Sequence, residues 1–301
     1  MSHTVGSDAR PFRFGYVILE VPDPAETARL LDRYFHLKVE DSAGGGKVVR
    51  GGTDHHWVQL ERGTTKRLRR LAFEMASPHD LEVAAKRLSD AGVEIETGTD
   101  REHHVGDYVR FRDPDDNPIE LYIAMTQMPV PVPPRLVQVR TMLHAFVTVP
   151  DIKRSYDFYS RVLGFRASDW VEQSAVFMHL ANGFHHSFAM MQAPGPSQVD
   201  HLCFLTESLD DVMRIRARSM VDQVDSRADV KRHAPSGSIS YYVTDTTSDL
   251  VLEACWDHMT IADSQTHQAR VLPKRPESGN VWLATEDGAV TDQMDGPLAD
   301  A

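Results

Sequence analysis

The sequence is poor in cysteine and in long apolar runs, and these shortages exclude several classes of protein. Cys203 and Cys255 are its only cysteines, so there is no disulfide framework, and we expect a protein of the reducing cytoplasm. No apolar run approaches the roughly 20 residues that a membrane-spanning helix needs. The first residues also lack the apolar core and cleavage site of a secretion signal. We therefore expect no membrane partner and no export.

Basic residues are too few to balance the acidic ones, with 32 Lys and Arg against 44 Asp and Glu. The formal net charge of -12 opposes a general attraction to phosphate backbones, so nucleic acid is not an expected partner. With 301 residues the chain is long enough for two domains, each with a core of its own. The sequence contains 15 histidines, but their number alone identifies no site, so their positions must decide.

The two halves of the chain repeat one another. The segment YVILEVPD at 16–23 matches HAFVTVPD at 144–151, and a helical pattern follows in both copies. Two further pairs match in the same order: RRLAFEM at 69–75 with DHLCFLT at 200–206, and PIELYIA at 118–124 with LVLEACW at 250–256. Self-similarity of this kind indicates a duplicated structural unit.

A proline-rich segment separates the two copies. The segment MPVPVPPRLVQ contains four prolines, which interrupt helices and sheets and stiffen a connector. The final residues are acidic and weakly apolar, a composition typical of disorder. The predicted organisation is an N-terminal tail at 1–10, a first domain at 11–127, a linker at 128–138, a second domain at 139–283 and a disordered tail at 284–301.

Within each domain, strand and helix patterns alternate twice in the same order. In the second domain, MLHAFVTV at 142–149 alternates like a strand, and residues 152–163 place apolar side chains at helical spacing. VFMHL at 176–180 and HHSFAMMQ at 185–192 follow as strands. The same order returns over 199–256. These patterns predict an α+β fold made of four βαβββ modules.

Two histidines and a glutamate lie on predicted strands of the second domain where they can converge. His144 is on the first strand of the third module, His201 on the first strand of the fourth, and Glu253 on the last strand of the fourth. A lone strand histidine is more often a core residue, but a buried glutamate is rare unless paired or bound to metal. Two imidazoles and one carboxylate suit non-haem Fe(II), and zinc with the same ligands can activate water.

The first domain provides an internal comparison for these three residues. At the matching positions it has Tyr16, Arg70 and Glu120, so a cation stands where metal would bind. The same scaffold is therefore expected to fold without the two histidines. This contrast favours a functional role for the histidines over a structural one.

On these residues and this module order, residues 12–283 resemble the type I extradiol ring-cleavage dioxygenases of the vicinal oxygen chelate superfamily. The chain looks especially like the 2,3-dihydroxybiphenyl and catechol 2,3-dioxygenases. The resemblance implies two tandem vicinal-oxygen-chelate domains, each of two βαβββ modules forming a cupped open barrel, with only the second catalytic. It also implies cleavage of a catechol by O2 at Fe(II), with Mn(II) as an alternative metal, and assembly into a homo-oligomer.

The resemblance also implies roles for six residues of the second domain. The metal ligands of the family fall on the two histidines and the glutamate described above. His186 in NGFHHSFAMM matches the acid–base histidine, His233 in KRHAPSG matches a further active-site histidine, and Tyr242 in SISYYVT matches the tyrosine that bonds a substrate oxygen. His185 and Tyr241 are open alternatives, because neighbouring strand residues face opposite sides.

Other readings of the same residues stay open. Cys203 and Cys255 lie on the same strand faces as His201 and Glu253, and we expect them to be core residues rather than ligands. Another metal enzyme of the superfamily, such as a glyoxalase-like isomerase or a thiol transferase, has no evident use for the diol-type set of His186 and its partners. A non-catalytic ligand-binding protein has no need of the ligand set. The sequence does not identify the catechol.

Overall fold

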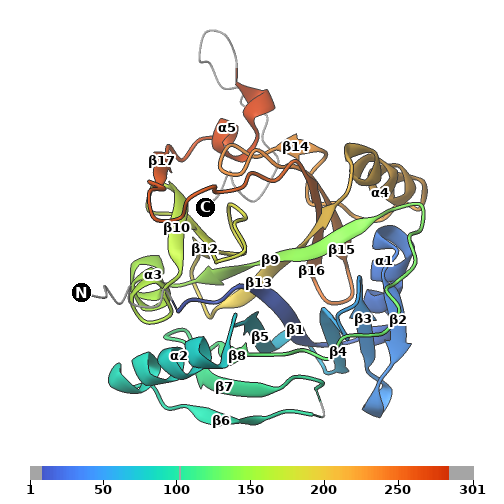
Figure 1. The fold of residues 1–301 in the computed structure, drawn as a ribbon. Helices are drawn as coiled ribbons and strands as arrows, with labels where there is room; N and C mark the ends of the chain where they lie inside the picture. Colours follow the sequence, from blue (N-terminus) through green and yellow to red (C-terminus); the bar gives the residue numbers. More distant parts are fainter. Residues whose placement is uncertain (1–8, 102, 285–301) are drawn as a thin grey trace.

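A computed structural model describes residues 9–101 and 103–284 of the chain (Figure 1). The predicted tails therefore lie largely outside the described residues. Ala9 and Arg10, at the end of the predicted N-terminal tail, are buried, and the carbonyl of Ala9 accepts a hydrogen bond from Arg87. These two residues pack against the folded part of the chain.

The first half forms an eight-stranded sheet with strand order β2-β3-β4-β1-β5-β8-β7-β6. Its elements are β1 (Arg13–Val21), α1 (Pro24–Phe35), β2 (Lys38–Asp41), η1 (Ala43–Gly45), β3 (Lys47–Arg50), β4 (Val58–Arg62), β5 (Arg67–Glu74), α2 (Pro78–Asp90), β6 (Glu96–Thr99), β7 (Asp107–Arg112) and β8 (Pro118–Tyr122). The edge strands β2 and β6 do not pair with each other, so the sheet stays open.

The second half forms a nine-stranded sheet with order β14-β15-β16-β13-β9-β12-β11-β10-β17. Its elements are β9 (Val139–Val149), α3 (Ile152–Arg161), β10 (Arg166–Val171), β11 (Ala175–His179), β12 (Phe188–Gln192), β13 (Gln198–Thr206), α4 (Leu209–Val221), β14 (Lys231–Arg232), β15 (Ile239–Asp245), β16 (Leu250–Trp256), β17 (Arg270–Leu272), α5 (Pro276–Gly279) and η2 (Val281–Leu283). The predicted fold of two tandem α+β domains with four βαβββ modules is confirmed. Strand β17 was not anticipated.

The repeated VPD motif begins the first helix of each half. The Asp23 side chain accepts hydrogen bonds from the backbone N–H groups of Ala25 and Glu26 at the start of α1. Asp151 accepts one from the N–H of Arg154 at the start of α3. A carboxylate at this position satisfies N–H groups that the helix itself cannot pair. The motif therefore recurs because both copies end a strand and cap a helix.

Strand registers place the matched residues of the two halves in the same positions. In each half, the first strand of the second module lies between the first strand of the first module and the last strand of the second module. A small side chain on this middle strand is directly opposite one residue on each of the two neighbouring strands. The matched pairs are Tyr16–Ala72 and Ala72–Glu120 in the first sheet, and His144–Cys203 and Cys203–Glu253 in the second. The structural repeat therefore agrees with the repeat read from the sequence.

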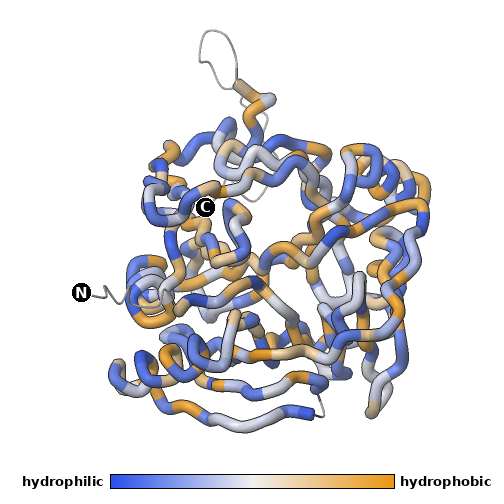
Figure 2. The backbone as a smooth tube through the Cα atoms, in the orientation of Figure 1, coloured by the Kyte–Doolittle hydropathy of each residue, from blue (hydrophilic) through white to orange (hydrophobic). Residues whose placement is uncertain are grey.

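The two halves share one hydrophobic core. In Figure 1 the second sheet lies above the first, and α1 lies beside α4. The Phe35 ring of the first half is 5.1 Å from the Phe204 ring of the second, and the Phe73 ring is also 5.1 Å from the Phe165 ring. Apolar and polar positions alternate along both halves (Figure 2).

The segment between the sheets is irregular. Apart from a single bridge between Gln127 and Asp54, residues 123–138 contain no helix or strand. The predicted boundaries of the domains and of the linker remain predictions. No helix within residues 9–101 and 103–284 is both long enough and apolar enough to cross a membrane.

Candidate metal centre

Three side chains converge from three adjacent strands of the second sheet. His144 on β9 and His201 on β13 bring their Nε2 atoms within 3.2 Å of each other. Glu253 on β16 places Oε2 3.4 Å from the Nε2 of His144 and 3.0 Å from that of His201. All three are buried, with exposed fractions of 3%, 7% and 3%. The structure thus brings the three candidate ligands together.

The spacing and chemistry of these donor atoms fit a divalent transition-metal ion. Donor atoms about 2.1 Å from one ion and at right angles to each other lie roughly 3 Å apart. Burial opposes ionisation of Glu253, but hydrogen bonds with His144 and His201 hold the pKa of its carboxyl well below the usual value. A buried anionic oxygen beside two imidazole nitrogens is the donor set that such an ion requires.

A second carboxylate orients one of the candidate ligands. Asp200 Oδ2 lies 2.6 Å from Nδ1 of His201, and Arg227 Nη1 lies 2.5 Å from the same oxygen. Burial disfavours a charged His201 ring, but hydrogen bonds to Asp200 and Glu253 outweigh it and raise the pKa of the ring. A carboxylate behind a ligating histidine fixes its tautomer and directs Nε2 at the metal. Asp200 was not among the site residues predicted from the sequence.

Of the two adjacent histidines, His186 is the one that faces the ligands. Its ring centroid lies 4.3 Å from that of His144, whereas Nε2 of His185 points to Asp169 Oδ2 at 2.9 Å. Both residues precede β12, which begins at Phe188. The expectation that they lie on a strand was therefore wrong. The two rings point in different directions because the chain turns before β12, and not because neighbouring strand residues alternate.

His233 and Tyr242 meet beside Glu253. The Tyr242 hydroxyl donates to Glu253 Oε1 at 3.3 Å, and Nε2 of His233 lies 2.8 Å from that hydroxyl. Burial raises the pKa of Tyr242 well above its usual value, so the phenol keeps its proton. Tyr241 points the other way and bonds Ser219 Oγ on α4 at 2.8 Å. Tyr242 is therefore the tyrosine on the ligand side of the sheet.

His258, directly after β16, was missed. Its ring lies 4.7 Å from that of His186, its Nε2 accepts from the His186 backbone N–H at 3.3 Å, and Nδ1 bonds Ser238 Oγ at 2.8 Å. Burial lowers the pKa of His258 well below its usual value. The first half has Met125 at the matching position. In both halves the preceding residue, Ala124 or Asp257, has a positive φ. Comparison of the repeats would have found it.

The two cysteines are buried beside the centre. Cys203 lies near His144 and Glu253, with its Sγ and their ligand atoms within 4.8 Å of one another, and its Sγ is 3.4 Å from that of Cys255. Burial raises the pKa of the Cys203 thiol well above its usual value. A neutral thiol is a poor metal ligand, which supports the expectation that the cysteines are core residues.

In the first half, arginine side chains occupy the corresponding space. Arg110 Nε donates to Glu120 Oε2 at 2.7 Å, and Arg70 Nη1 lies 3.4 Å from the same oxygen. The Tyr16 hydroxyl donates to the other oxygen of this carboxylate. Arg110 faces Glu120 across the strands as Tyr242 faces Glu253. Guanidinium charge thus neutralises the glutamate that the first half retains.

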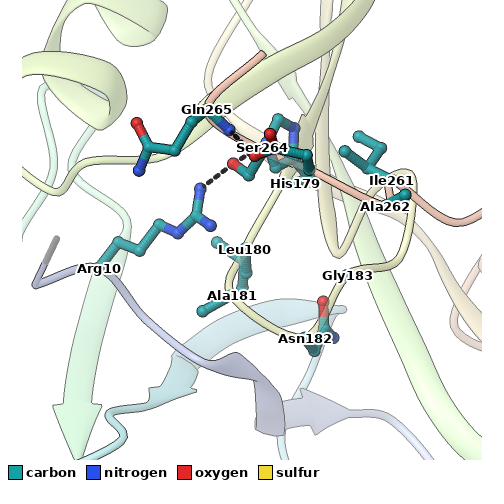
Figure 3. Close-up of a pocket in the computed structure, with 11 residues that line it drawn as sticks. Arg10, His179, Leu180, Ala181, Asn182, Gly183, Ile261, Ala262, Ser264 and Gln265 are labelled. Carbon is teal, nitrogen blue, oxygen red and sulfur yellow. Dashed lines mark hydrogen bonds between the residues drawn. The ribbon is translucent and has the colours of Figure 1, made fainter. Parts of the chain in front are cut away.

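A pocket of about 340 Å³ lies apart from these residues, between Arg10 and residues 261–265 (Figure 3). His179 lines it, with Nδ1 2.8 Å from Ser168 Oγ and Nε2 2.7 Å from Ser264 Oγ. Its lining contains none of the predicted site residues. The pocket is therefore not the candidate metal centre.

Comparison with known proteins gives relatives of similar length. The chain is 26% identical over 269 residues to a biphenyl-2,3-diol 1,2-dioxygenase of Paraburkholderia xenovorans (strain LB400), covering 82% of this chain and 88% of that protein. It is 27% identical over 202 residues to an iron-dependent extradiol dioxygenase of Rhodococcus jostii (strain RHA1), covering 60% and 67% of the two chains.

Among solved structures, the Mn(II)-bound glyoxalase from Novosphingobium aromaticivorans superposes with a TM-score of 0.82 at 23% identity, covering 96% of both chains. At this identity the likeness shows the fold alone. The family model described as Glyoxalase/Bleomycin resistance protein/Dioxygenase superfamily matches residues 13–121 and 141–247. Both halves of the chain match it, and the chain belongs to this superfamily.

Proposed function

We propose that the protein cleaves the aromatic ring of a catechol-type diol, using O2 at a non-haem Fe(II) site in the second domain. The bond cleaved is a ring C–C bond adjacent to, and not between, the two carbons that carry the hydroxyl groups. The observation that carries this proposal is the convergence of His144, His201 and Glu253 in one half only. The relatives named above as extradiol and biphenyl-diol dioxygenases support it.

The metal would be held by His144, His201 and Glu253, with iron favoured and manganese as the alternative. The relatives and neighbours include an iron-dependent dioxygenase and a manganese-bound glyoxalase. Bound iron would lower the pKa of a diol oxygen and supply the redox chemistry with O2. Three ligands on one side leave open positions for a substrate.

The remaining residues of the centre would handle protons and orient the diol. His186 lies next to the ligands and would exchange a proton with an oxygen of the substrate. Tyr242, with its raised pKa, can donate a hydrogen bond to a substrate oxygen. The His233 ring, 2.8 Å from the Tyr242 hydroxyl, holds that phenol in place. The roles of His186 and Tyr242 agree with those that the family resemblance implies.

We further infer a cytoplasmic homo-oligomer. The edge strands of both sheets, among them β14 and β17, end without a further partner strand among the described residues. Val271 on the edge strand β17 is 69% exposed, and Val221 at the end of helix α4 is 81% exposed, so both side chains offer apolar area for contact. Light scattering on the purified protein would measure the number of subunits.

The proposed reaction can be tested with purified, iron-loaded protein. The protein is prepared without oxygen, its metal content is measured, and a panel of monocyclic and biphenyl-type catechols is tested with an oxygen electrode and for coloured products. We expect one O2 consumed per catechol and a yellow ring-fission product. Glu253→Ala provides the metal-free control.

Two outcomes would contradict this function. Iron-loaded protein that consumes no O2 with any catechol would exclude it. Isomerisation of a glutathione–methylglyoxal adduct by the same preparation, without ring cleavage, would instead assign the glyoxalase-like activity of the superfamily.

A further inference from the structure

We propose that Asp169 and His185 form a buried hydrogen-bond relay that fixes the tautomer of His186 and presents its Nε2 as a proton acceptor at the metal centre. Asp169 and His185 are thereby positioning residues for the ring cleavage, and this part of the inference rests on the proposed function.

The relay is a continuous chain of short contacts. Asp169 Oδ2 lies 2.9 Å from Nε2 of His185, and Nδ1 of His185 lies 3.1 Å from Nδ1 of His186. Asp169 and His185 are completely buried and His186 nearly so. Within the part of the chain that the structure describes, these two ring nitrogens of His185 have no further hydrogen-bond partner.

The direction of each hydrogen bond follows from the chemistry of the groups. Burial would raise the pKa of Asp169, but hydrogen bonds from His185 and Arg270 lower it, so the carboxylate is ionised and only accepts. The His185 proton therefore sits on Nε2, and its Nδ1 carries a lone pair. Nδ1 of His186 must then donate, which leaves the lone pair of His186 on Nε2.

Arg270 holds the start of the relay. Its backbone N–H donates to Asp169 Oδ1 at 3.0 Å and its Nε to the same oxygen at 2.9 Å. Its Nη2 also donates to the carbonyl of Pro235 at 2.6 Å. Arg270 begins β17, which pairs in parallel with β10. The additional strand at the sheet edge thus has a role in orienting the carboxylate.

The first half contains the histidine pair but lacks the relay. His55 and His56 also approach through Nδ1 atoms, at 3.1 Å. Strand β10 has one extra residue at a bulge after Ala167, so by strand register Asp169 matches Glu40 of β2. Glu40 instead lies 2.6 Å from Lys38 Nζ. The His55 ring stacks on His104 at 3.5 Å. Among the described residues, the hydrogen bond between this carboxylate and the first histidine of the pair is therefore present only in the half that carries the candidate metal ligands.

Kinetics separate a positioning role from a structural one. Asp169→Asn and His185→Gln are expected to lower kcat about 10- to 100-fold while KM and iron content stay within twofold of wild type. His55→Gln, the matched change in the first half, should leave kcat unchanged, and Asp169→Glu should recover part of the loss. Wild-type kcat in iron-loaded Asp169→Asn would overturn the inference, as would an equal loss in His55→Gln.

A second measurement reads the tautomer directly. In the zinc-loaded protein with ¹⁵N-labelled histidine, NMR should show His186 protonated on Nδ1 in wild type and a mixture of tautomers in Asp169→Asn. Protonation of His186 on Nε2 in wild type would contradict the relay. If the wild-type protein cleaves no catechol, the proposed function fails, and the NMR comparison still decides whether the relay sets the tautomer.

Discussion

Glu253 and Glu120 occupy matching positions in the two halves, yet different partners compensate their charge. Glu253 Oε2 lies 3.0 Å from Nε2 of His201, whereas Glu120 Oε2 accepts from Arg110 at 2.7 Å. An unpaired buried charge is costly. Arg110, a cation of the chain itself, compensates the charge of Glu120, so this carboxylate needs no bound ion. Within the described residues Glu253 has no such arginine partner, so its charge is available to compensate a bound metal ion.

This contrast predicts which substitutions release metal. His201→Ala and Glu253→Ala should lose at least about nine-tenths of the bound metal, because two donors hold an ion far more weakly than three. Arg70→Ala in the first half should keep a full complement. Elemental analysis of the dialysed proteins gives the ratio of metal to chain. Full metal in both second-half variants would exclude this ligand set.

His186 should be required for turnover and not for metal binding. Its ring lies beside His144 but outside the three ligands, so His186→Gln should retain metal. Loss of a proton-exchanging group should lower kcat about 10²- to 10⁴-fold. Steady-state oxygen uptake at saturating catechol measures this. A variant that turns over at the wild-type rate would assign the proton exchange to another group, with His258 the nearest.

His56 should make stability depend on pH. Burial, with repulsion from His55, lowers the pKa of His56 to about 3 from 6.5. The unfolded chain therefore takes up this proton first as the pH falls from 6.5 toward 3, and the folded state loses stability over that range. Between pH 7 and pH 5 the loss is roughly 2 kcal/mol.

The substitution His56→Gln should flatten this part of the pH profile. Urea unfolding at pH 7 and pH 5 measures the difference in the free energy of unfolding. His79→Gln, at an exposed position, changes the histidine count equally and should leave the profile as in wild type. An unchanged slope in His56→Gln would show that His56 takes up its proton in the folded state.

At the scale of the elements, helix α3 depends on the repeated VPD motif. Asp151 accepts from the N–H of Arg154 at 3.0 Å. Asp151→Ala should lower the free energy of unfolding by about 1 kcal/mol, because an N–H group of the first turn loses its partner. Asp151→Asn, which caps about as well, should have little effect. Thermal or urea unfolding compares the two, and equal stability of all three proteins would contradict the assignment.

At the scale of the whole molecule, aromatic rings join the two halves into one unit. The Phe73 ring of the first half lies 5.1 Å from Phe165 and 5.7 Å from Phe188 of the second. Phe73→Ala should therefore cost about 3–5 kcal/mol. We expect both halves to unfold in one transition at lower denaturant, seen together by tryptophan fluorescence and by metal release. Separate transitions would mean that the halves fold independently.

The elements and their order could be predicted from the amino-acid sequence alone. Hydrophobic periodicity and the internal repeat predicted four βαβββ modules, because these signals act within a few residues or between two copies of the same pattern. The repeat also singled out His144 and His201, since the first half does without them. His258 was within reach of the same comparison.

Which side chains meet at the candidate metal centre could be seen only in the tertiary structure. His186 and His185 lie in an irregular turn where strand alternation does not apply, and the register of β15 against β16 places Tyr242 opposite Glu253. The contacts of Asp169 with His185 and Arg270 join segments far apart in the sequence. Such contacts depend on long-range packing, which no local pattern of residues encodes.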